Sequence, residues 1–201
     1  YFFNLEKNSA EKGVFESLYW PELPDTLEQG GCSTRWLHIW IKDSIAPTAI
    51  DARQLIEQFN RVSGGKQIHV TLDSFLGFRP VMNTLLDWLR LLWKSQNLSK
   101  ILNRSSSTAM DLWPILSDDW QSSLKGPIAI RNLLMLNLFE EAFSEIPQQK
   151  RGFYLQENQG WEFGCITAWK NSGHEVINGV PHSTVFFWDL RYFFDVRSYR
   201  P

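Results

Sequence analysis

Residues 35–72, "RWLHIWIKDSIAPTAIDARQLIEQFNRVSGGKQIHVTL", decide the fold that the sequence predicts. The first seven, "RWLHIWI" over 35–41, are aromatic and β-branched, which is typical of a buried strand. The following segment carries apolar residues at helical spacing and ends at a pair of glycines, with the apolar positions at Ile50, Leu55, Ile56 and Phe59. "KQIHVTL" over 66–72 predicts a second strand. A strand, a helix and a strand in this order predict two parallel strands joined by a crossover helix.

The rest of the chain extends this pattern. Three helices are predicted within a block at 80–146, the first with Leu85, Leu86, Leu89, Leu92 and Trp93 on one face and the last beginning at Pro127. "GFYLQ" then predicts a strand, residues 161–171 a helix, and "EVING" a further strand. The α/β order predicts a Rossmann-like open parallel sheet of four or more strands, flanked by helices, with the helical block at 80–146 as an insertion.

Composition excludes several classes of protein. The 20 basic and 22 acidic residues nearly balance, which argues against non-specific binding of nucleic acid. No apolar run approaches the length of a membrane-spanning helix and no signal peptide is evident, so we expect a soluble, cytoplasmic protein. The two cysteines, Cys32 and Cys165, are too few and too far apart for a disulfide framework or a zinc site, and we expect two buried thiols.

Several familiar catalytic motifs are missing. The sequence contains no GxxxxGK[ST], GxGxxG, HExxH or GxSxG, which argues against phosphate-loop, dinucleotide, zincin and serine-hydrolase chemistry. It also contains no Asp-x-Asp pair, the spacing that clamps a metal for a sugar nucleotide in one large class of glycosyltransferases. We therefore predict no metal site.

Polar clusters follow three of the predicted strands, in "HVTLDSF", "QENQ" and "VPHST". Ligands of open parallel sheets gather beyond the carboxyl ends of the strands, so these clusters predict a binding site. The alternative is that polar loops simply follow strands. Asp73, in the first cluster, either binds a ligand at the strand end or caps the turn.

His182 is the sharpest candidate for catalysis. It follows Pro181 at a strand end, and the adjacent Ser183 and Thr184 offer hydroxyl and backbone N–H groups for a substrate. A histidine with an ordinary pKa near 6.5 can act as a general base on a sugar hydroxyl or donate to a phosphate. The alternative is a histidine hydrogen-bonded to a neighbouring loop.

Glu157, Asn158 and Gln159 form the second candidate cluster, because carboxylate acceptors and amide donors suit sugar hydroxyls. Glu157 is the predicted catalytic member and the two amides are predicted to bind substrate. The alternative is a capping cluster for the helix that starts near Trp161.

The other histidines and most of the ten tryptophans are expected to be structural. His174 follows "NSG" where a helix ends, a position that favours a cation. His38 and His69 lie within predicted strands and, if they face inward, are expected to be core residues with satisfied hydrogen bonds. Some tryptophans also suit stacking on sugar rings, although most belong to the core.

Taken together, "WLHIW", "HVTLDSFL", "YLQENQGWE", "AWKNSGHEVINGVPHSTV" and "FWDLRYF" resemble a family of surface-carbohydrate biosynthesis proteins encoded among polysaccharide and O-antigen genes. The resemblance covers most of the chain and is strongest from 154 to 195. It implies a glycosyltransferase of the two-domain GT-B type, which needs no Asp-x-Asp motif. "PHST" also resembles, more weakly, the His-Gly-Thr turn of CDP-glycerol glycerophosphotransferases, which implies a catalytic base only at His182. Ser183 stands where that turn has glycine.

The resemblance also implies the organisation of the whole protein. Residues 1–180 would form a Rossmann-like, acceptor-side domain, and 181–201 would begin a linker or a second, nucleotide-binding domain. The substrates implied are a nucleotide-sugar donor and a glycan or lipid-linked glycan acceptor, with peripheral association at the inner face of the membrane and with no other cofactor held by these residues. The competing hypothesis is a non-catalytic carbohydrate-binding or scaffold module.

Overall fold

The structure, a computed structural model, describes residues 5–104 and 113–181, and the side chains of 5–96 and 117–181. The described chain forms two compact units. The strand unit comprises residues 5–74, 151–158 and 177–181, and the helical unit comprises 75–150 and 159–176, without the masked residues 105–112. The predicted boundary near residue 180 coincides with the end of the described chain, so it stays a prediction.

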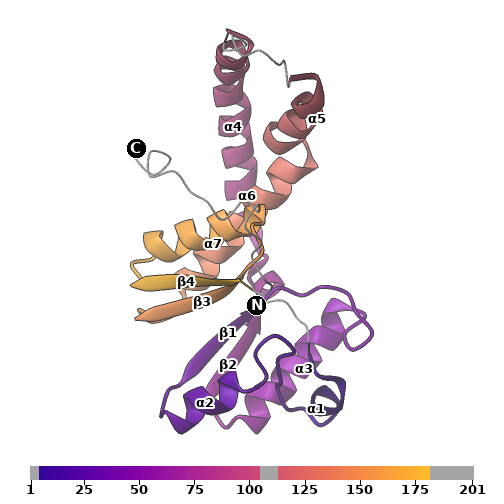
Figure 1. Cartoon of the computed structure of the whole chain (residues 1–201), viewed down its shortest axis with the longest axis vertical. Helices are drawn as coiled ribbons and strands as arrows, with labels where there is room; N and C mark the ends of the chain where they lie inside the picture. Colours follow the sequence, from indigo (N-terminus) through magenta and orange to yellow (C-terminus); the bar gives the residue numbers. More distant parts are fainter. Residues whose placement is uncertain (1–4, 105–112, 182–201) are drawn as a thin grey trace. The chain divides into compact units, whose positions relative to one another are not determined.

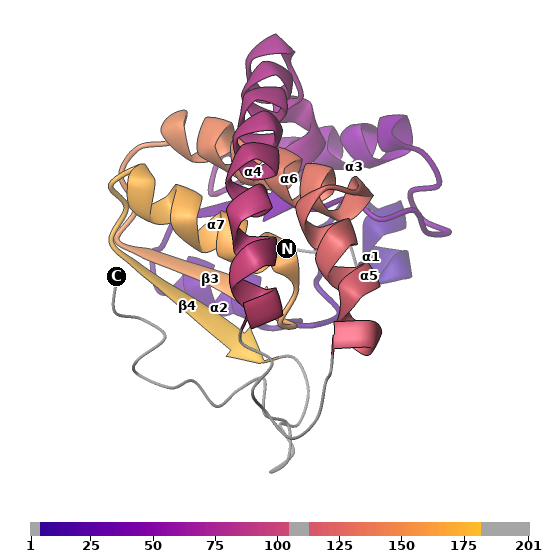
Figure 2. The ribbon, with the colours of Figure 1, turned by 90° about the horizontal axis from the view of Figure 1, so that it is seen from above.

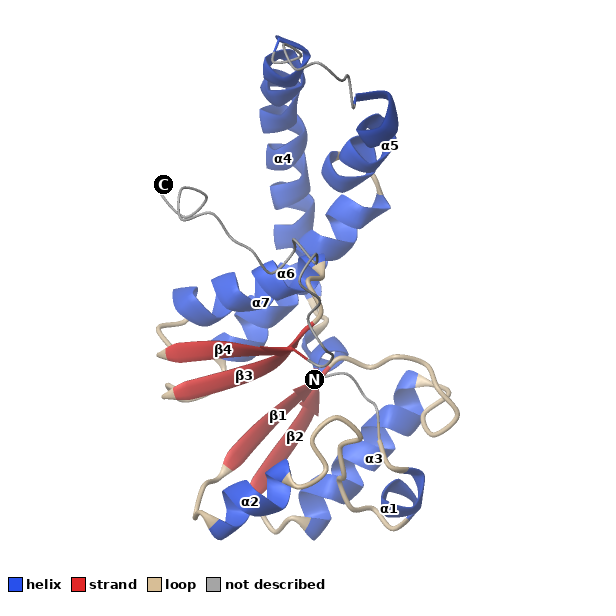
Figure 3. Cartoon of the chain, viewed as in Figure 1, coloured by secondary structure: helices blue, strands red, loops and turns tan. Residues whose placement is uncertain are grey.

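The elements of each unit are drawn in Figures 1 and 3. The strands and the first helices belong to the strand unit: α1 (Lys7–Glu11), α2 (Leu23–Gln29), β1 (Thr34–His38), α3 (Ala49–Val62), β2 (Gln67–Thr71), the 3-10 helix η1 (Leu72–Phe75) at its edge, β3 (Arg151–Gln156) and β4 (Val176–Pro181). The helical unit contains α4 (Phe78–Arg104), α5 (Trp113–Leu124), α6 (Pro127–Ser144) and α7 (Gly160–Asn171). The predicted α/β class and the helical block at 80–146 are thereby confirmed.

The predicted β-α-β unit is present. Strands β1 and β2 pair in parallel, in a register that runs from Thr34 opposite Gln67 to His38 opposite Thr71, and α3 connects them. A capping box starts α3: the Thr48 hydroxyl accepts from the Asp51 N–H at 3.2 Å, and the Asp51 carboxylate accepts from the Thr48 N–H at 2.9 Å. The helix ends before two glycines in the left-handed region, a conformation that costs glycine little.

Two local predictions fail in this unit. The first strand ends at His38 and not at residue 41, because the chain turns: the Asp43 carboxylate accepts from the Ile45 and Ala46 N–H groups, at 2.8 and 2.7 Å. Ile50, predicted on the apolar face of α3, is 67% exposed. The first turn of α3 projects beyond the core, which α3 reaches through Ala52, Ile56 and Phe59.

The four strands form two two-stranded parallel sheets, β1-β2 and β3-β4, within the described residues. The sequence predicts one open sheet of four or more strands, whereas the described residues show two separate pairs. No ladder of backbone hydrogen bonds joins the two pairs in the described chain, so each pair has two outer edges without a strand partner among the described residues.

In the helical unit α6 contacts α4, α5 and α7 and is its central helix (Figure 2). Small residues bring α7 close to α6: a Cβ on Gly164 would lie 3.2 Å from the Leu136 Cα, and Ala168, one turn further, is fully buried. Gly160 faces the Asn132 side chain in the same way, 2.7 Å from where its Cβ would stand. Three small residues spaced by four therefore form the contact face of α7.

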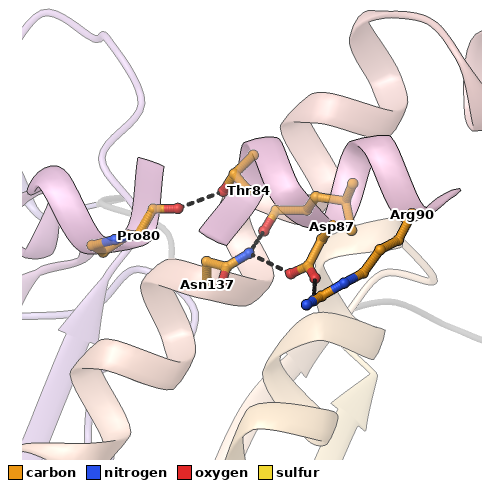
Figure 4. Close-up of polar contacts among 6 residues, drawn as sticks. Pro80, Thr84, Asp87, Arg90 and Asn137 are labelled. Carbon is orange, nitrogen blue, oxygen red and sulfur yellow. Dashed lines mark hydrogen bonds and ion pairs between the residues drawn. The ribbon is translucent and has the colours of Figure 1, made fainter. Parts of the chain in front are cut away.

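The contact between α4 and α6 is polar (Figure 4). The buried Asn137 amide donates to the Asp87 carboxylate at 3.3 Å and to the Leu133 carbonyl at 3.0 Å, and the Arg90 guanidinium donates to Asp87 at 2.8 Å. Thr84, also buried, donates to the Pro80 carbonyl one turn back, at 2.8 Å. The polar face of α4 is therefore the one that packs on α6.

Candidate functional site

The loop from β3 to α7 contains the predicted residues Glu157, Asn158 and Gln159. Gln159 is the N-cap of α7, and its N–H donates to the buried Glu162 carboxylate at 2.7 Å. The capping alternative therefore holds for Gln159. Glu157 is partly buried in the same loop.

Asn158 differs from its neighbours. Its φ of 59° lies in the left-handed region, which asparagine tolerates better than most residues. Its side-chain Nδ2 is buried and has no hydrogen-bond partner within the described residues. The backbone thus holds, at the carboxyl end of β3, an amide donor for which residues 5–104 and 113–181 supply no acceptor.

A second set of polar groups lies at the carboxyl end of β2. Thr71, the last residue of the strand, is 2% exposed, and its hydroxyl has no partner in the described part of the chain. Asp73 follows in η1, and its Oδ2 accepts from the Arg53 guanidinium at 3.1 Å. The other oxygen, Oδ1, is buried and has no partner among the described residues. The structure thus gives one oxygen of Asp73 an ion pair with α3, while the described chain offers no partner to the other.

Three of the buried polar atoms that lack a partner among the described residues lie at the same kind of position in the fold. Thr71 Oγ1, Asp73 Oδ1 and Asn158 Nδ2 stand at or just after the carboxyl ends of β2 and β3, all in the strand unit. An unpaired buried polar atom costs about 1–3 kcal/mol, so native proteins usually supply a partner. A hydroxyl, a carboxylate oxygen and an amide N–H together match groups that both donate and accept, as water and sugar hydroxyls do.

His38 and His69 form a buried pair in the core of the strand unit. They are 0% and 2% exposed, their rings stack with centroids 5.3 Å apart, and His38 Nε2 lies 3.1 Å from His69 Nδ1. The other His69 nitrogen lies 3.2 Å from the Gln67 carboxamide oxygen, which only accepts, so His69 carries its proton on Nε2. His38 must then donate from Nε2 to His69 Nδ1. The prediction that both are core histidines is confirmed.

This environment keeps both imidazoles neutral. Burial lowers the pKa of His69 from its ordinary value to about 4. Burial, and then the neighbouring His69, lowers the pKa of His38 well below its ordinary value. Phe15 and Trp36 pack against the His69 ring, with centroids 4.7 and 6.3 Å away. The pair is therefore a structural element of the core that is neutral at neutral pH and gains charge only in acid.

Side chains from α3 cover the outer edge of β2. The Asn60 amide donates to the His69 carbonyl at 2.8 Å and accepts from the His69 N–H at 2.7 Å, replacing a strand partner. The Ser63 hydroxyl donates to the Gln67 carbonyl at 2.8 Å. Since alternate residues of a strand present their N–H and C=O to the same edge, this edge of β2 is occupied at Gln67 and His69.

The remaining structural predictions have mixed outcomes. His174 is buried behind α6: its Nδ1 accepts from the Gln149 N–H and its Nε2 donates to the Phe143 carbonyl, both at 3.1 Å, which confirms a structural role. Trp161 is 6% exposed, which agrees with the expectation that most of the tryptophans belong to the core. Cys165 is buried, and burial raises the pKa of its thiol to about 12, but Cys32 is exposed. The prediction of two buried thiols is wrong for Cys32, which lies in the turn after α2.

The predicted catalytic His182 and its neighbours Ser183 and Thr184 lie outside the described residues. Asp73, Glu157 and Asn158 lie at the strand ends where the sequence predicts them, on two different sheets. Sequence reasoning missed Thr71 and Asn60. The alternation of side chains along a strand predicts that Thr71 faces inward. A buried threonine next to a polar cluster was the signal that could have identified it.

Comparison of the chain with protein-family models, with curated proteins and with solved structures finds no match. Within residues 5–104 and 113–181 no helix has the length and apolar character needed to cross a bilayer. The same residues contain no group of three or more histidine, cysteine, aspartate or glutamate side chains able to hold a metal ion.

Proposed function

We propose that the chain belongs to a GT-B-like glycosyltransferase of surface polysaccharide biosynthesis, which transfers a sugar from a nucleotide-activated donor to a glycan acceptor. One observation in the structure supports this proposal more than any other. Three buried polar atoms without a partner among the described residues, Thr71 Oγ1, Asp73 Oδ1 and Asn158 Nδ2, lie at or just after the carboxyl ends of two strands, where α/β proteins bind their ligands. The resemblance of the sequence to surface-carbohydrate biosynthesis proteins supplies the class of reaction.

The two sheets are proposed to be halves of one Rossmann-like sheet with strand order β2-β1-β3-β4. Side chains of α3 occupy the outer edge of β2, so a further strand can join this sheet only at β1. All four strands belong to the same compact unit. In this order β2 lies on one side of β1, and β3 and β4 lie on the other side. The position between β1 and β3 is therefore the topological switch point, where such sheets bind ligands.

In this proposal the strand ends bind the acceptor. Asp73 and Thr71 accept from its hydroxyl groups, Asn158 donates to a hydroxyl or ring oxygen, and Glu157 orients the reacting hydroxyl. Arg53 holds the Asp73 carboxylate in place through the 3.1 Å ion pair. His182 acts as the general base that removes the proton of the attacking hydroxyl, with Ser183 and Thr184 beside the donor phosphates.

A pair of threonine variants tests the site. Thr71→Val removes a buried hydroxyl without a partner in the described chain, so it should raise the free energy of unfolding by about 1 kcal/mol. It should also raise the KM for the acceptor about tenfold, because one buried hydrogen bond to the ligand is lost. Thr84→Val is the matched control: its hydroxyl donates to the Pro80 carbonyl within the helical unit, so stability should fall and KM should not change.

The assay follows nucleotide release by the protein as the cell makes it, with a panel of nucleotide sugars and lipid-linked glycan acceptors. His182→Ala should lower turnover about 10²–10⁴-fold and leave the far-ultraviolet circular dichroism spectrum unchanged. Glu157→Gln should mainly weaken acceptor binding, since it keeps the shape of the side chain and removes its charge. Glycan binding without transfer of any sugar would favour a carbohydrate-binding module. If Thr71→Val is less stable than the parent protein and its KM for the acceptor is unchanged, the proposed site is wrong.

A further inference from the structure

The long helix α4 presents an apolar face that no described element covers. Phe78, Val81, Leu85, Leu89 and Trp93 are 82%, 48%, 44%, 50% and 71% exposed. They lie three or four residues apart, so they form one continuous stripe along four turns of the helix. We call these five residues the α4 stripe.

The opposite face of α4 already has its partner. Thr84 and Ser95 are buried, and Asp87 accepts from Asn137 of α6 across the interface, as Figure 4 shows. A helix in a globular unit normally packs its apolar face inward and leaves its polar face in water. Helix α4 does the reverse, so the α4 stripe is not part of the core of the helical unit.

The charge of α4 indicates which kind of partner the α4 stripe would bind. The helix contains five basic residues and one acidic residue, while the whole chain has a net charge of −2, with the basic residues at Arg79, Arg90, Lys94, Lys100 and Arg104. The described cations Arg79, Arg90 and Lys94 are exposed and lie along one margin of the stripe, because their spacing follows the helical turn. Ion pairs with Glu141 and Asp87 leave the Arg79 and Arg90 side chains 74% and 69% exposed to solvent.

We propose that α4 binds the surface of an anionic lipid bilayer, with the α4 stripe among the acyl chains and the basic margin at the lipid phosphates. An exposed apolar face with phenylalanine, leucine and tryptophan next to lysine and arginine has the composition of helices that lie in the membrane interface. Each basic residue adds attraction to an anionic surface. A second copy of the chain is a poorer partner for the stripe, because it would bring the same basic margins together. This inference does not depend on the proposed transferase activity.

The test is co-sedimentation of the protein with vesicles of phosphatidylcholine alone and with vesicles that also contain phosphatidylglycerol. We expect binding to the anionic vesicles that weakens as salt is added. Leu89→Glu should lower the partition coefficient at least about tenfold, since burying one leucine contributes one factor of ten or more to binding. Lys94→Gln should cause a smaller loss, of about fivefold.

Ile50→Glu is the matched control. Ile50 is 67% exposed on α3, outside the α4 stripe, so this variant makes the same change of charge and should bind the vesicles as the parent protein does. Light scattering and circular dichroism of Leu89→Glu and Trp93→Glu complete the test. The inference is overturned by absence of binding, by equal binding to both kinds of vesicle, by a dimer that Leu89→Glu dissociates, or by unfolding of both glutamate variants.

Discussion

Acid should lower the free energy of unfolding of the strand unit, because His38 and His69 are buried as neutral side chains. Both are neutral in the fold because burial lowers their pKa values, to about 4 for His69, while an unfolded histidine has a pKa near 6.5. Below about pH 6.5 the unfolded chain therefore binds protons that the folded chain does not, and stability falls as the pH falls. The contribution of the two histidines to stability is fully present above their pKa in the unfolded chain. It is lost progressively as the pH falls toward their pKa in the folded chain.

The size of the effect follows from linkage. Each histidine that is charged only in the unfolded state lowers the free energy of unfolding by about 1.4 kcal/mol per pH unit. Two such histidines give a slope of about 2.7 kcal/mol per unit between about pH 6 and pH 5, and a total loss of about 4 kcal/mol between pH 7 and pH 5. For His69 alone, the loss down to about pH 4 is about 3 kcal/mol.

Amide hydrogen exchange read by mass spectrometry measures this locally. After correction for the intrinsic exchange rate, peptides that cover β1 and β2 report the free energy of opening of the strand unit at each pH. His38→Gln keeps a donor for His69 Nδ1 and removes one titrating group, so its slope should be half that of the parent. A pH-independent opening free energy between pH 7 and pH 5, or an equal slope in His38→Gln, would refute the assigned charge states.

Three further substitutions probe packing. Gly164→Val should destabilise the helical unit by about 1–3 kcal/mol, measured by urea unfolding, because even a Cβ would approach the Leu136 Cα to 3.2 Å. Asn137→Ala should cost about 1–3 kcal/mol in the same assay, since it takes away the buried donor to Asp87. Trp161→Ala should cost about 3–5 kcal/mol and reduce the yield of folded protein, because the side chain is 6% exposed.

Two controls accompany these substitutions. Gly77→Ala places its Cβ 4.0 Å from the nearest carbonyl and should change stability by less than about 0.5 kcal/mol. Trp93→Ala removes a tryptophan that is 71% exposed, so it should leave the unfolding midpoint nearly unchanged. A large loss in either control would mean that the exposure of these positions is misjudged.

Local patterns predicted the elements well because local physics determines them. The β-branched run that contains His69 specifies β2, and the Thr48–Asp51 capping box starts α3 at Ala49. The pairing of strands depends on hydrogen bonds between segments that are not neighbours in the sequence, such as Thr34 and Gln67, and periodicity carries no information about these bonds. The same holds for α4: its stripe is plain in the sequence, but which face meets α6 depends on Asn137, far along the chain.

The candidate site was likewise predictable only in part. The positions of Asp73 and Asn158 at strand ends follow from the order of strands and loops. Whether a particular atom finds a partner depends on the rotamers and neighbours around it, as with Arg53, which occupies only one oxygen of Asp73. Thr71 escaped notice because threonine in a strand is ordinary.

The chain passes between the two units four times, after residues 74, 150, 158 and 176. Each crossover between strands takes two of these passages, so the helices that make up the helical unit are the connections that carry the chain from β2 to β3 and from β3 to β4. During synthesis on the ribosome, β3 emerges only after α4, α5 and α6, and β4 only after α7. The strand unit can therefore be neither completed nor obtained by a single truncation before the last strand has been translated, and the entropy of closing these long loops must be overcome late in folding.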